Sequence, residues 1–247
     1  MSRLIALDAG HGLFTAGKRT KIIPELGRHI VEHEFNRAIV DLMKPDLERH
    51  GFRVLLTAPN PKLDTALSTR VNVANKYKAD IFVSVHYNAG GGIGLETFYH
   101  RYSTKGRHLA QLVHKRLIAT KLRKDRGIKT QNFYVLRETK MPAVLIEYGF
   151  MDDPQMKEAR EMLNRHVQKQ FAIATTKGIC EYFGVVYKED KPVVAKPTIP
   201  SVMYDVGEVI DGVRKGIRST RHWNEIEPVL KNLWAEGKEV YIIPRKS

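Results

Sequence analysis

The sequence predicts an α/β fold: a mixed, mostly parallel twisted sheet with helices on both faces, plus a small C-terminal ββαβ domain. Short apolar runs rich in β-branched residues alternate with longer segments of helical periodicity, the pattern of a sheet covered on both faces. A proline-bearing stretch separates these elements from a second, shorter set. The length of 247 residues fits one ordinary domain and a small appendage.

The larger domain is expected at residues 1–187. Its first predicted helix repeats Phe35, Ile39 and Leu42 at helical spacing. Pro45 lies inside that helix and lacks an N–H, so it predicts a kink or break near residues 40–41. Strands are expected at about 3–8, 52–57, 80–85, 95–99, 133–136 and 143–148, and helices at about 32–50, 65–78, 105–121 and 155–183.

Residues 188–202 contain three prolines and no amphipathic period, which predicts an extended linker. The domain expected at 203–247 begins with two strands joined at Asp211 and Gly212, a hairpin signal. An amphipathic helix with Trp223 and Trp234 follows, and then a last strand. So small a unit should bury its apolar helix face by forming a homodimer or by docking on a partner.

The chain is strongly basic, with 41 Lys and Arg against 27 Asp and Glu and a net charge of +14. Such a charge favours a polyanionic partner, which could be nucleic acid, an anionic membrane or an anionic cell-wall polymer. The basic residues are dispersed, without the interleaved aromatics or the Cys/His spacing of nucleic-acid-binding modules. We therefore expect no nucleic acid among the partners.

Compartment and membrane signals are few. The single cysteine, Cys180, excludes an intramolecular disulfide and lies in an apolar helical pattern, so it should be a buried hydrophobic residue. The apolar run near the N-terminus is too short for a secretory signal and leads directly into the first motif. No run approaches the roughly 20 apolar residues that span a bilayer, so no membrane insertion is expected.

Three predicted strands end in side chains with metal-binding or acid–base chemistry. His11 follows the first strand, His86 follows the third, and Glu147 ends the last strand of the larger domain. In open α/β sheets, the carboxyl edge of the strands is where sites are built. Two imidazoles and a carboxylate are the ligands of a catalytic zinc site, and three protein ligands leave a position for water. We therefore predict that His11 and His86 bind one zinc ion.

The residues leave the third ligand open among Glu25, Glu32 and Glu34, of which Glu32 begins the first long helix. Glu147 is the expected catalytic residue, which takes a proton from water and passes it to the leaving amine. Asp8 precedes His11 by three positions and is expected to orient a ligand imidazole.

Together these residues carry a resemblance to a known family. The chain resembles the zinc-dependent N-acetylmuramoyl-L-alanine amidases of the amidase-3 family over roughly residues 3–183. At Ala9 the family commonly has proline. The resemblance rests on six segments in the same order, at residues 8–12, 32–39, 67–75, 79–89, 133–137 and 141–150.

The resemblance implies an enzyme that cleaves the amide between N-acetylmuramic acid and L-alanine in peptidoglycan. By position, it implies His11, Glu32 and His86 as ligands of one zinc ion and Glu147 as the catalytic glutamate. The pattern of Glu32 followed four residues later by Asn36 selects Glu32 over Glu25. Three further residues match family positions near the groove and are candidates for substrate binding: Arg70, Asn88 and Asn132.

The expected absence of a leader and the small C-terminal domain favour a phage endolysin. Such a protein is made in the host cytoplasm and acts on the cell wall after release. A leaderless sporulation autolysin made in a mother cell, with the same chemistry, is the alternative. A third hypothesis is a non-enzymatic, basic protein of the same fold that binds wall polymer or nucleic acid; it would have no use for Glu147.

Overall fold

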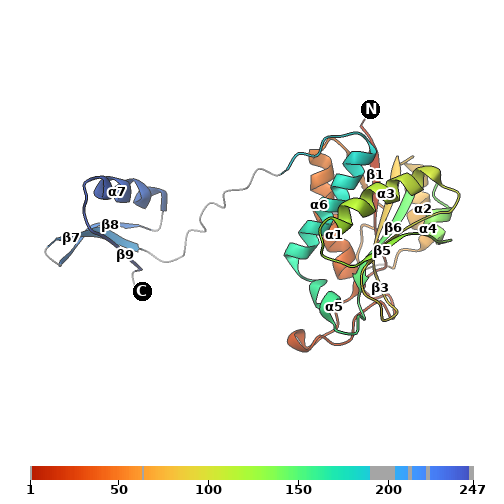
Figure 1. Cartoon of the computed structure of the whole chain (residues 1–247), viewed down its shortest axis with the longest axis horizontal. Helices are drawn as coiled ribbons and strands as arrows, with labels where there is room; N and C mark the ends of the chain where they lie inside the picture. The colour runs from red at the N-terminus through yellow and green to blue at the C-terminus, as the bar shows by residue number, and fades with distance from the viewer. Residues whose placement is uncertain (1, 63, 190–203, 211–212, 221–222, 245–247) are drawn as a thin grey trace. The chain divides into compact units, whose positions relative to one another are not determined.

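The computed structural model describes residues 2–62, 64–189, 204–210, 213–220 and 223–244 (Figure 1). It divides the chain into two compact units, Met1–Lys188 and Glu189–Ser247.

A six-stranded sheet forms the centre of the first unit. Its order is β2-β1-β3-β6-β4-β5. All neighbouring strands are parallel except β4, which runs antiparallel to β6. The strands are β1 (Leu4–Ala9), β2 (Arg53–Leu56), β3 (Ile81–Asn88), β4 (Leu95–Tyr99), β5 (Asp125–Thr130) and β6 (Ala143–Phe150).

Helices cover both faces of this sheet because its strands are apolar on both sides (Figure 1). In β1, Ile5 and Leu7 join one core cluster, with residues of α1, α3 and α6, whereas Leu4 and Ala6 join the other, with residues of α2 and α4. The helices are η1 (Pro24–Leu26), α1 (Glu32–Arg49), α2 (Leu67–Lys76), α3 (Thr104–Ile118), α4 (Tyr134–Arg137), α5 (Lys157–Glu161) and α6 (Arg165–Tyr182).

Strand register brings the predicted site residues to one edge of the sheet. Ala9 at the end of β1 lies opposite Val85 of β3. His86, the next residue of β3, lies opposite Glu147 of β6. Side chains that are far apart in the sequence therefore meet at the carboxyl ends of three adjacent parallel strands.

The predicted fold class is confirmed, and four details of the first unit are corrected. The segment expected as a strand at 133–136 is helix α4, and the edge strand β5 was not anticipated. The helix expected at 155–183 is divided into α5 and α6. Helix α1 continues through residues 40–41 without a break, although Pro45 lies inside it. The buried side chains of Met43 and Leu47, on either side of this proline, hold the helix against the core.

The second unit has the predicted order of two strands, a helix and a strand. The elements are β7 (Tyr204–Ile210), β8 (Val213–Thr220), α7 (Trp223–Ala235) and β9 (Val240–Pro244), and the antiparallel sheet has the order β8-β7-β9. Val206 and Leu230 are buried together, and Val240 packs against them. The proposed linker from 190 on, the turn at Asp211 and Gly212, and the side chains of Trp223 and Trp234 lie outside the described residues.

No helix in the described part of the chain combines the length and the apolar character that crossing a bilayer requires.

Candidate metal and catalytic site

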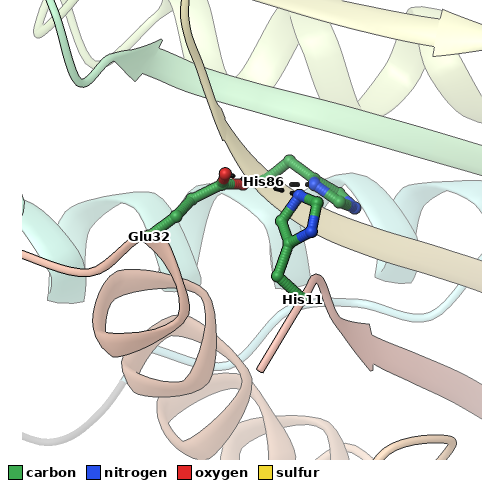
Figure 2. Close-up of side chains that lie close together, drawn as sticks. All are labelled: His11, Glu32 and His86. Carbon is green, nitrogen blue, oxygen red and sulfur yellow. Dashed lines mark hydrogen bonds and ion pairs between the residues drawn. The ribbon is translucent and has the colours of Figure 1, made fainter. Parts of the chain in front are cut away.

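His11, Glu32 and His86 form a cluster at the carboxyl edge of the sheet (Figure 2). One ligand atom from each lies within 4.8 Å of those from the other two. His11 comes from the loop after β1, Glu32 from the first turn of α1, and His86 from β3. The two imidazole rings stand nearly perpendicular, with their centroids 5.0 Å apart. This donor set of two nitrogens and a carboxylate fits a divalent metal ion of the zinc type.

Glu32 accepts hydrogen bonds on one carboxylate oxygen only. Its Oε1 accepts from the backbone N–H of Tyr87 at 3.0 Å and from Asn36 Nδ2 at 3.2 Å. Its Oε2 is buried without a hydrogen-bond partner in the described part of the chain and lies 3.4 Å from His11 Nε2. A buried carboxylate oxygen without a donor is costly unless it binds a cation. Glu32 therefore has an oxygen available for a metal ion.

The other two glutamates considered for the third ligand position are engaged elsewhere. Glu34 forms a bidentate ion pair with Arg28 and accepts a hydrogen bond from the backbone N–H of Val31. Glu25 is exposed and binds Arg160. Neither belongs to the cluster that the structure forms around the two histidines.

The ring of His86 packs directly on Gly10. A Cβ atom at position 10 would lie 2.3 Å from Cε1 of this ring, so only glycine leaves room for it. The ring is also held at both nitrogens, because Nδ1 lies 3.2 Å from Glu32 Oε1 and Nε2 lies 3.1 Å from Ser84 Oγ. The glycine of the first motif thus sets the position of a histidine from another strand.

His11 has a left-handed backbone, with a φ of 59°, which is uncommon for a residue other than glycine. Arg70 stabilises this conformation by hydrogen bonds to the backbone on either side of Gly10. Its guanidinium donates to the carbonyl of Ala9 at 2.6 Å and to the carbonyl of His11 at 2.8 Å. Backbone strain of this kind persists only where surrounding contacts maintain it, and it is frequent at functional sites.

Asp8 contacts Ser84 and Arg70, and its role in orienting a ligand imidazole stays a prediction. Its carboxylate accepts hydrogen bonds from Ser84 Oγ at 2.7 Å, from Thr57 Oγ1 and from Arg70 Nη1 at 2.8 Å. Burial raises the pKa of Asp8, but the charge of Arg70 and these hydrogen bonds outweigh it, so the net shift is downward. Asp8 is therefore an anion. It links Arg70 to Ser84, whose hydroxyl in turn contacts His86.

The electrostatics of the cluster suit cation binding. Burial lowers the pKa of His11 to about 4, so this imidazole is neutral at physiological pH. Burial would raise the pKa of Glu32, but the hydrogen bond and charge of His86 outweigh it and lower the pKa to about 2. In His86 burial lowers the pKa, and the same contact with Glu32 reverses that effect and raises it. Glu32 therefore carries a negative charge at physiological pH.

Glu147 is the residue beside this cluster that can exchange a proton. Its Oε2 is buried and has no hydrogen-bond partner among the described residues. Burial raises its pKa to about 8, although the charge of His86 acts in the opposite direction. A carboxyl group whose pKa lies near neutrality can both accept and donate a proton during a reaction.

A cavity of about 570 Å³ lies beside the cluster and Glu147. Glu147, His11, His86 and Asn88 line it together with residues of the 64–67 segment and α4. Asn88 donates from Nδ2 to Glu96 Oε1 at 2.7 Å, which fixes the side chain at the cavity wall. Asn132 is exposed and is not among the lining residues.

Arg70 also lines the cavity, but its donors are committed to protein acceptors. Besides Asp8 and the two carbonyls, Arg70 Nε donates to the carbonyl of Thr65 at 2.8 Å. The residue is only 1% exposed. These contacts give Arg70 a structural role; substrate contact by Arg70, Asn88 or Asn132 stays a prediction.

Two residues that shape the site were not given a role from the sequence: Gly10 makes room for His86, and Ser84 holds its Nε2. Asn36, whose spacing from Glu32 was used to select that glutamate, donates a hydrogen bond to it. His33 is also buried, and its Nδ1 forms a hydrogen bond with the Gly10 carbonyl at 2.9 Å. The i, i+4 spacing of Glu32 and Asn36 places both side chains on one helix face, and this spacing is the sequence signal for their contact.

The family model described as N-acetylmuramoyl-L-alanine amidase matches residues 5–181. A cell wall amidase of Bacillus anthracis, described as uncharacterised, is 33% identical over 196 residues, which cover 73% of this chain and 35% of that protein. The chain thus spans about a third of that relative's length.

Two further relatives differ in their biological setting. An endolysin of Bacillus phage SPP1 is 35% identical over 211 residues, which cover 78% of this chain and 73% of the endolysin. A sporulation-specific N-acetylmuramoyl-L-alanine amidase of Bacillus subtilis is 34% identical over 151 residues, with 60% and 56% covered.

Solved structures agree with these sequence matches. The catalytic domain of CwlV, an N-acetylmuramoyl-L-alanine amidase from Bacillus (Paenibacillus) polymyxa, has a TM-score of 0.65 and 32% identity, and the match covers 74% of this chain and 99% of that one. An N-acetylmuramoyl-L-alanine amidase from Clostridium difficile 630 has a TM-score of 0.67 and 31% identity, with 74% and 97% covered.

Proposed function

This chain belongs to the N-acetylmuramoyl-L-alanine amidase family, and we propose that it is a zinc-dependent peptidoglycan hydrolase. Its reaction would be hydrolysis of the amide that joins the lactyl group of N-acetylmuramic acid to L-alanine. The observation that carries the proposal is the cluster of His11, Glu32 and His86, with Glu147 opposite His86 in the sheet.

His11, Glu32 and His86 would hold one zinc ion per chain. The fit rests on the unpartnered Glu32 Oε2, the neutral His11 imidazole and the mutual distances of the donor atoms. When bound, zinc supplies a Lewis acid that polarises the amide carbonyl and lowers the pKa of water.

Glu147 would carry the proton. In its ionised form it accepts a proton from the attacking water, and in its protonated form it donates that proton to the departing amine of L-alanine. More positive charge at the neighbouring cluster favours the ionised form, because the charge of His86 already lowers the pKa of Glu147. Such a residue contributes on the order of 10²–10⁴ in rate.

The remaining residues of the site would hold these groups in place. Ser84 and Asp8 orient His86, and Arg70 fixes the strained backbone at His11. Within the cavity, Asn88 is the candidate that best fits substrate contact, because it lines the wall and is anchored by Glu96. A reacting pair depends on such support, since a misplacement of about 1 Å can cost about 10² in rate.

For the biological setting we propose a phage endolysin that is made in the host cytoplasm and reaches the wall on release. The similarity to the SPP1 endolysin over 78% of this chain supports this setting. The similarity to the sporulation-specific amidase supports the alternative of a mother-cell autolysin with the same chemistry. The unit from Glu189 on would bind the wall or form a homodimer, and the basic charge of the chain suits an anionic wall polymer.

Digestion of purified peptidoglycan tests the proposed reaction. Cleavage should release new N-terminal L-alanine without new reducing sugar, and a metal chelator should abolish it until Zn²⁺ is restored. Glu147→Ala should fail to cleave while it retains zinc. New reducing ends would rule the amidase out, and full activity of the Glu147→Ala protein would rule out the proton-transfer role of Glu147. Failure of the wild-type protein to cleave, with retained binding to wall polymer or nucleic acid, would favour the non-enzymatic role.

A further inference from the structure

The segment at residues 12–31 forms a hairpin-like arm beside the site. Two backbone bridges close it, one that pairs Arg19 with Val31 and one that pairs Ile23 with Arg28. Ile23 is 2% exposed, so the arm is anchored in the core of the unit. The arm therefore has a fixed position next to the cavity.

The base of the arm places Lys18 at the cavity. The backbone N–H of Glu32 donates to the carbonyl of Lys18 at 2.9 Å, so the residue that contributes the carboxylate also fixes Lys18. The ammonium of Lys18 lies 4.0 Å from Glu32 Oε2, and the side chain lines the cavity while remaining 39% exposed.

Lys18 differs from Arg70, the other lysine or arginine in the lining, because its donors are available. In the described part of the chain, the Lys18 ammonium has no hydrogen bond, and its one ion pair is the long contact with Glu32. Arg70 instead donates to Asp8 and to three backbone carbonyls. Lys18 thus offers a positive charge with three N–H donors to a molecule in the cavity.

The two halves of the substrate differ in charge near the bond that is cleaved. On the glycan side the groups are a lactyl carbonyl, an acetamide and hydroxyls, all uncharged. On the peptide side the residues after L-alanine carry carboxylates. An ammonium at hydrogen-bond distance from a carboxylate forms a charge-assisted bond, roughly twice as strong as a neutral one.

We propose that Lys18 binds a carboxylate of the substrate's peptide and so makes the enzyme select acidic stem peptides over amidated ones. This inference rests on the proposed amidase function. Lys18 is a specificity residue in this role, because it contacts the peptide and takes no part in the proton transfer.

Two soluble N-acetylmuramoyl peptides test the inference, with either a carboxylate or a carboxamide on the residue that follows L-alanine. The wild-type enzyme should prefer the carboxylate by about tenfold in kcat/KM, mainly through KM. This is the lower end of what a hydrogen bond to a charged group contributes, because Lys18 is partly solvated. Lys18→Met should remove the preference by losing activity on the carboxylate alone, and Lys18→Arg should retain part of it.

Arg19→Met is the matched control. It removes the same charge from the next residue, which is exposed and lies outside the cavity lining, and should keep the wild-type preference. Zinc content of all variants should be equal. Calorimetry with the acidic product peptide gives a readout independent of turnover, and Lys18→Met should weaken this binding by about tenfold.

Equal loss on both substrates, or lower zinc content in Lys18→Met, would mean that Lys18 serves Glu32 instead of the substrate. Equal cleavage of both substrates by the wild-type enzyme would overturn the inference and leave the amidase function intact. Failure to cleave either substrate would count against the amidase function, and calorimetry would then decide the role of Lys18 separately.

Discussion

Replacing Gly10 with alanine should displace His86, a proposed metal ligand, without changing any of the proposed ligand residues themselves. The new Cβ would lie 2.3–2.6 Å from three atoms of the His86 ring, far inside van der Waals contact. The backbone at Gly10 has little freedom to retreat. Its N–H donates to Val85 at 3.0 Å, and its carbonyl bonds with His33 Nδ1 at 2.9 Å and Asn36 Nδ2 at 3.1 Å. The ring of His86 must therefore move.

The size of the effect follows from the distance the ring must travel. Ordinary contact requires a shift of about 1 Å, and a shift of this size in a reacting group can cost about 10² in rate. The same movement breaks the contacts of His86 with Glu32 Oε1 at 3.2 Å and Ser84 Oγ at 3.1 Å. Losing such orienting contacts typically lowers metal affinity by about 10–100-fold. Overpacking should cost stability by only about 1–3 kcal/mol, so the protein should still fold.

Zinc affinity, measured by competition with a chromophoric chelator, is the primary assay. Two further measurements on the same proteins are the release of N-terminal L-alanine from peptidoglycan and the thermal midpoint of unfolding. Ala16→Ser is the control, because it adds one atom to an exposed residue of the neighbouring loop and should change none of the three. If Gly10→Ala bound zinc with wild-type affinity and retained full activity, the packing of His86 on Gly10 would not determine ligand position.

Four further predictions concern single residues or one unit. Glu147→Gln should lower kcat by about 10²–10⁴ with unchanged zinc content, as measured by elemental analysis; loss of zinc would contradict its assignment. In metal-free protein, burial raises the pKa of Glu147 from 4.5 to about 8, so its protonated form stabilises the native state below pH 4.5 and that stability is lost as the pH rises through 8. The Tm of wild type should therefore fall relative to Glu147→Gln over this window, and parallel Tm curves would refute the shift. Arg70→Met should lower the free energy of unfolding by about 3–5 kcal/mol in urea titrations, because it leaves the buried charge of Asp8 without its partner, whereas Lys44→Met at an exposed ion pair should cost less than about 1 kcal/mol. A chain that ends at Lys188 should fold, bind zinc and cleave soluble fragments but bind intact walls less well, and an insoluble product would contradict the two-unit division.

The strands of the sheet could be predicted where apolar runs are long and buried on both sides. β3 and β6 are such runs, and each ends in a polar site residue. β5 was missed because Asp125, Arg126 and Lys129 interrupt any apolar pattern in a partly exposed edge strand. Helix α4 was predicted as a strand because Phe133, Tyr134 and Val135 favour β structure locally, whereas packing of Val135 in the second core cluster outweighs that preference.

Residue types and strand ends were enough to place His11, His86 and Glu147 together, since parallel strands share one carboxyl edge. The roles assigned to Asp8 and Arg70 depended on three-dimensional contacts that spacing does not reveal. Arg70 reaches the site from α2 through a hydrogen bond to a residue 62 positions away. Contacts of this kind require the packed fold, which explains why the sequence could predict that the candidate ligands lie together and could not predict which residues hold them in place.

Unpartnered polar atoms separate the groups that support this site from those that act in it. Asp8 and Arg70 have strong protein partners, and each holds another part of the site. Glu32 Oε2 and Glu147 Oε2 are buried without hydrogen-bond partners among the described residues, a state that costs about 1–3 kcal/mol for each atom. His33 Nε2 and Asn36 Oδ1 on α1 share this state, whereas Asp152 Oδ1 and Thr176 Oγ1 are the other two such atoms in the described ranges. Four of the six atoms thus belong to the site or to the first turns of the helix that carries Glu32. Folding tolerates this concentration of cost where binding of a cation and a substrate offsets it, and this is the physical reason to regard the cavity as a site that is built for both.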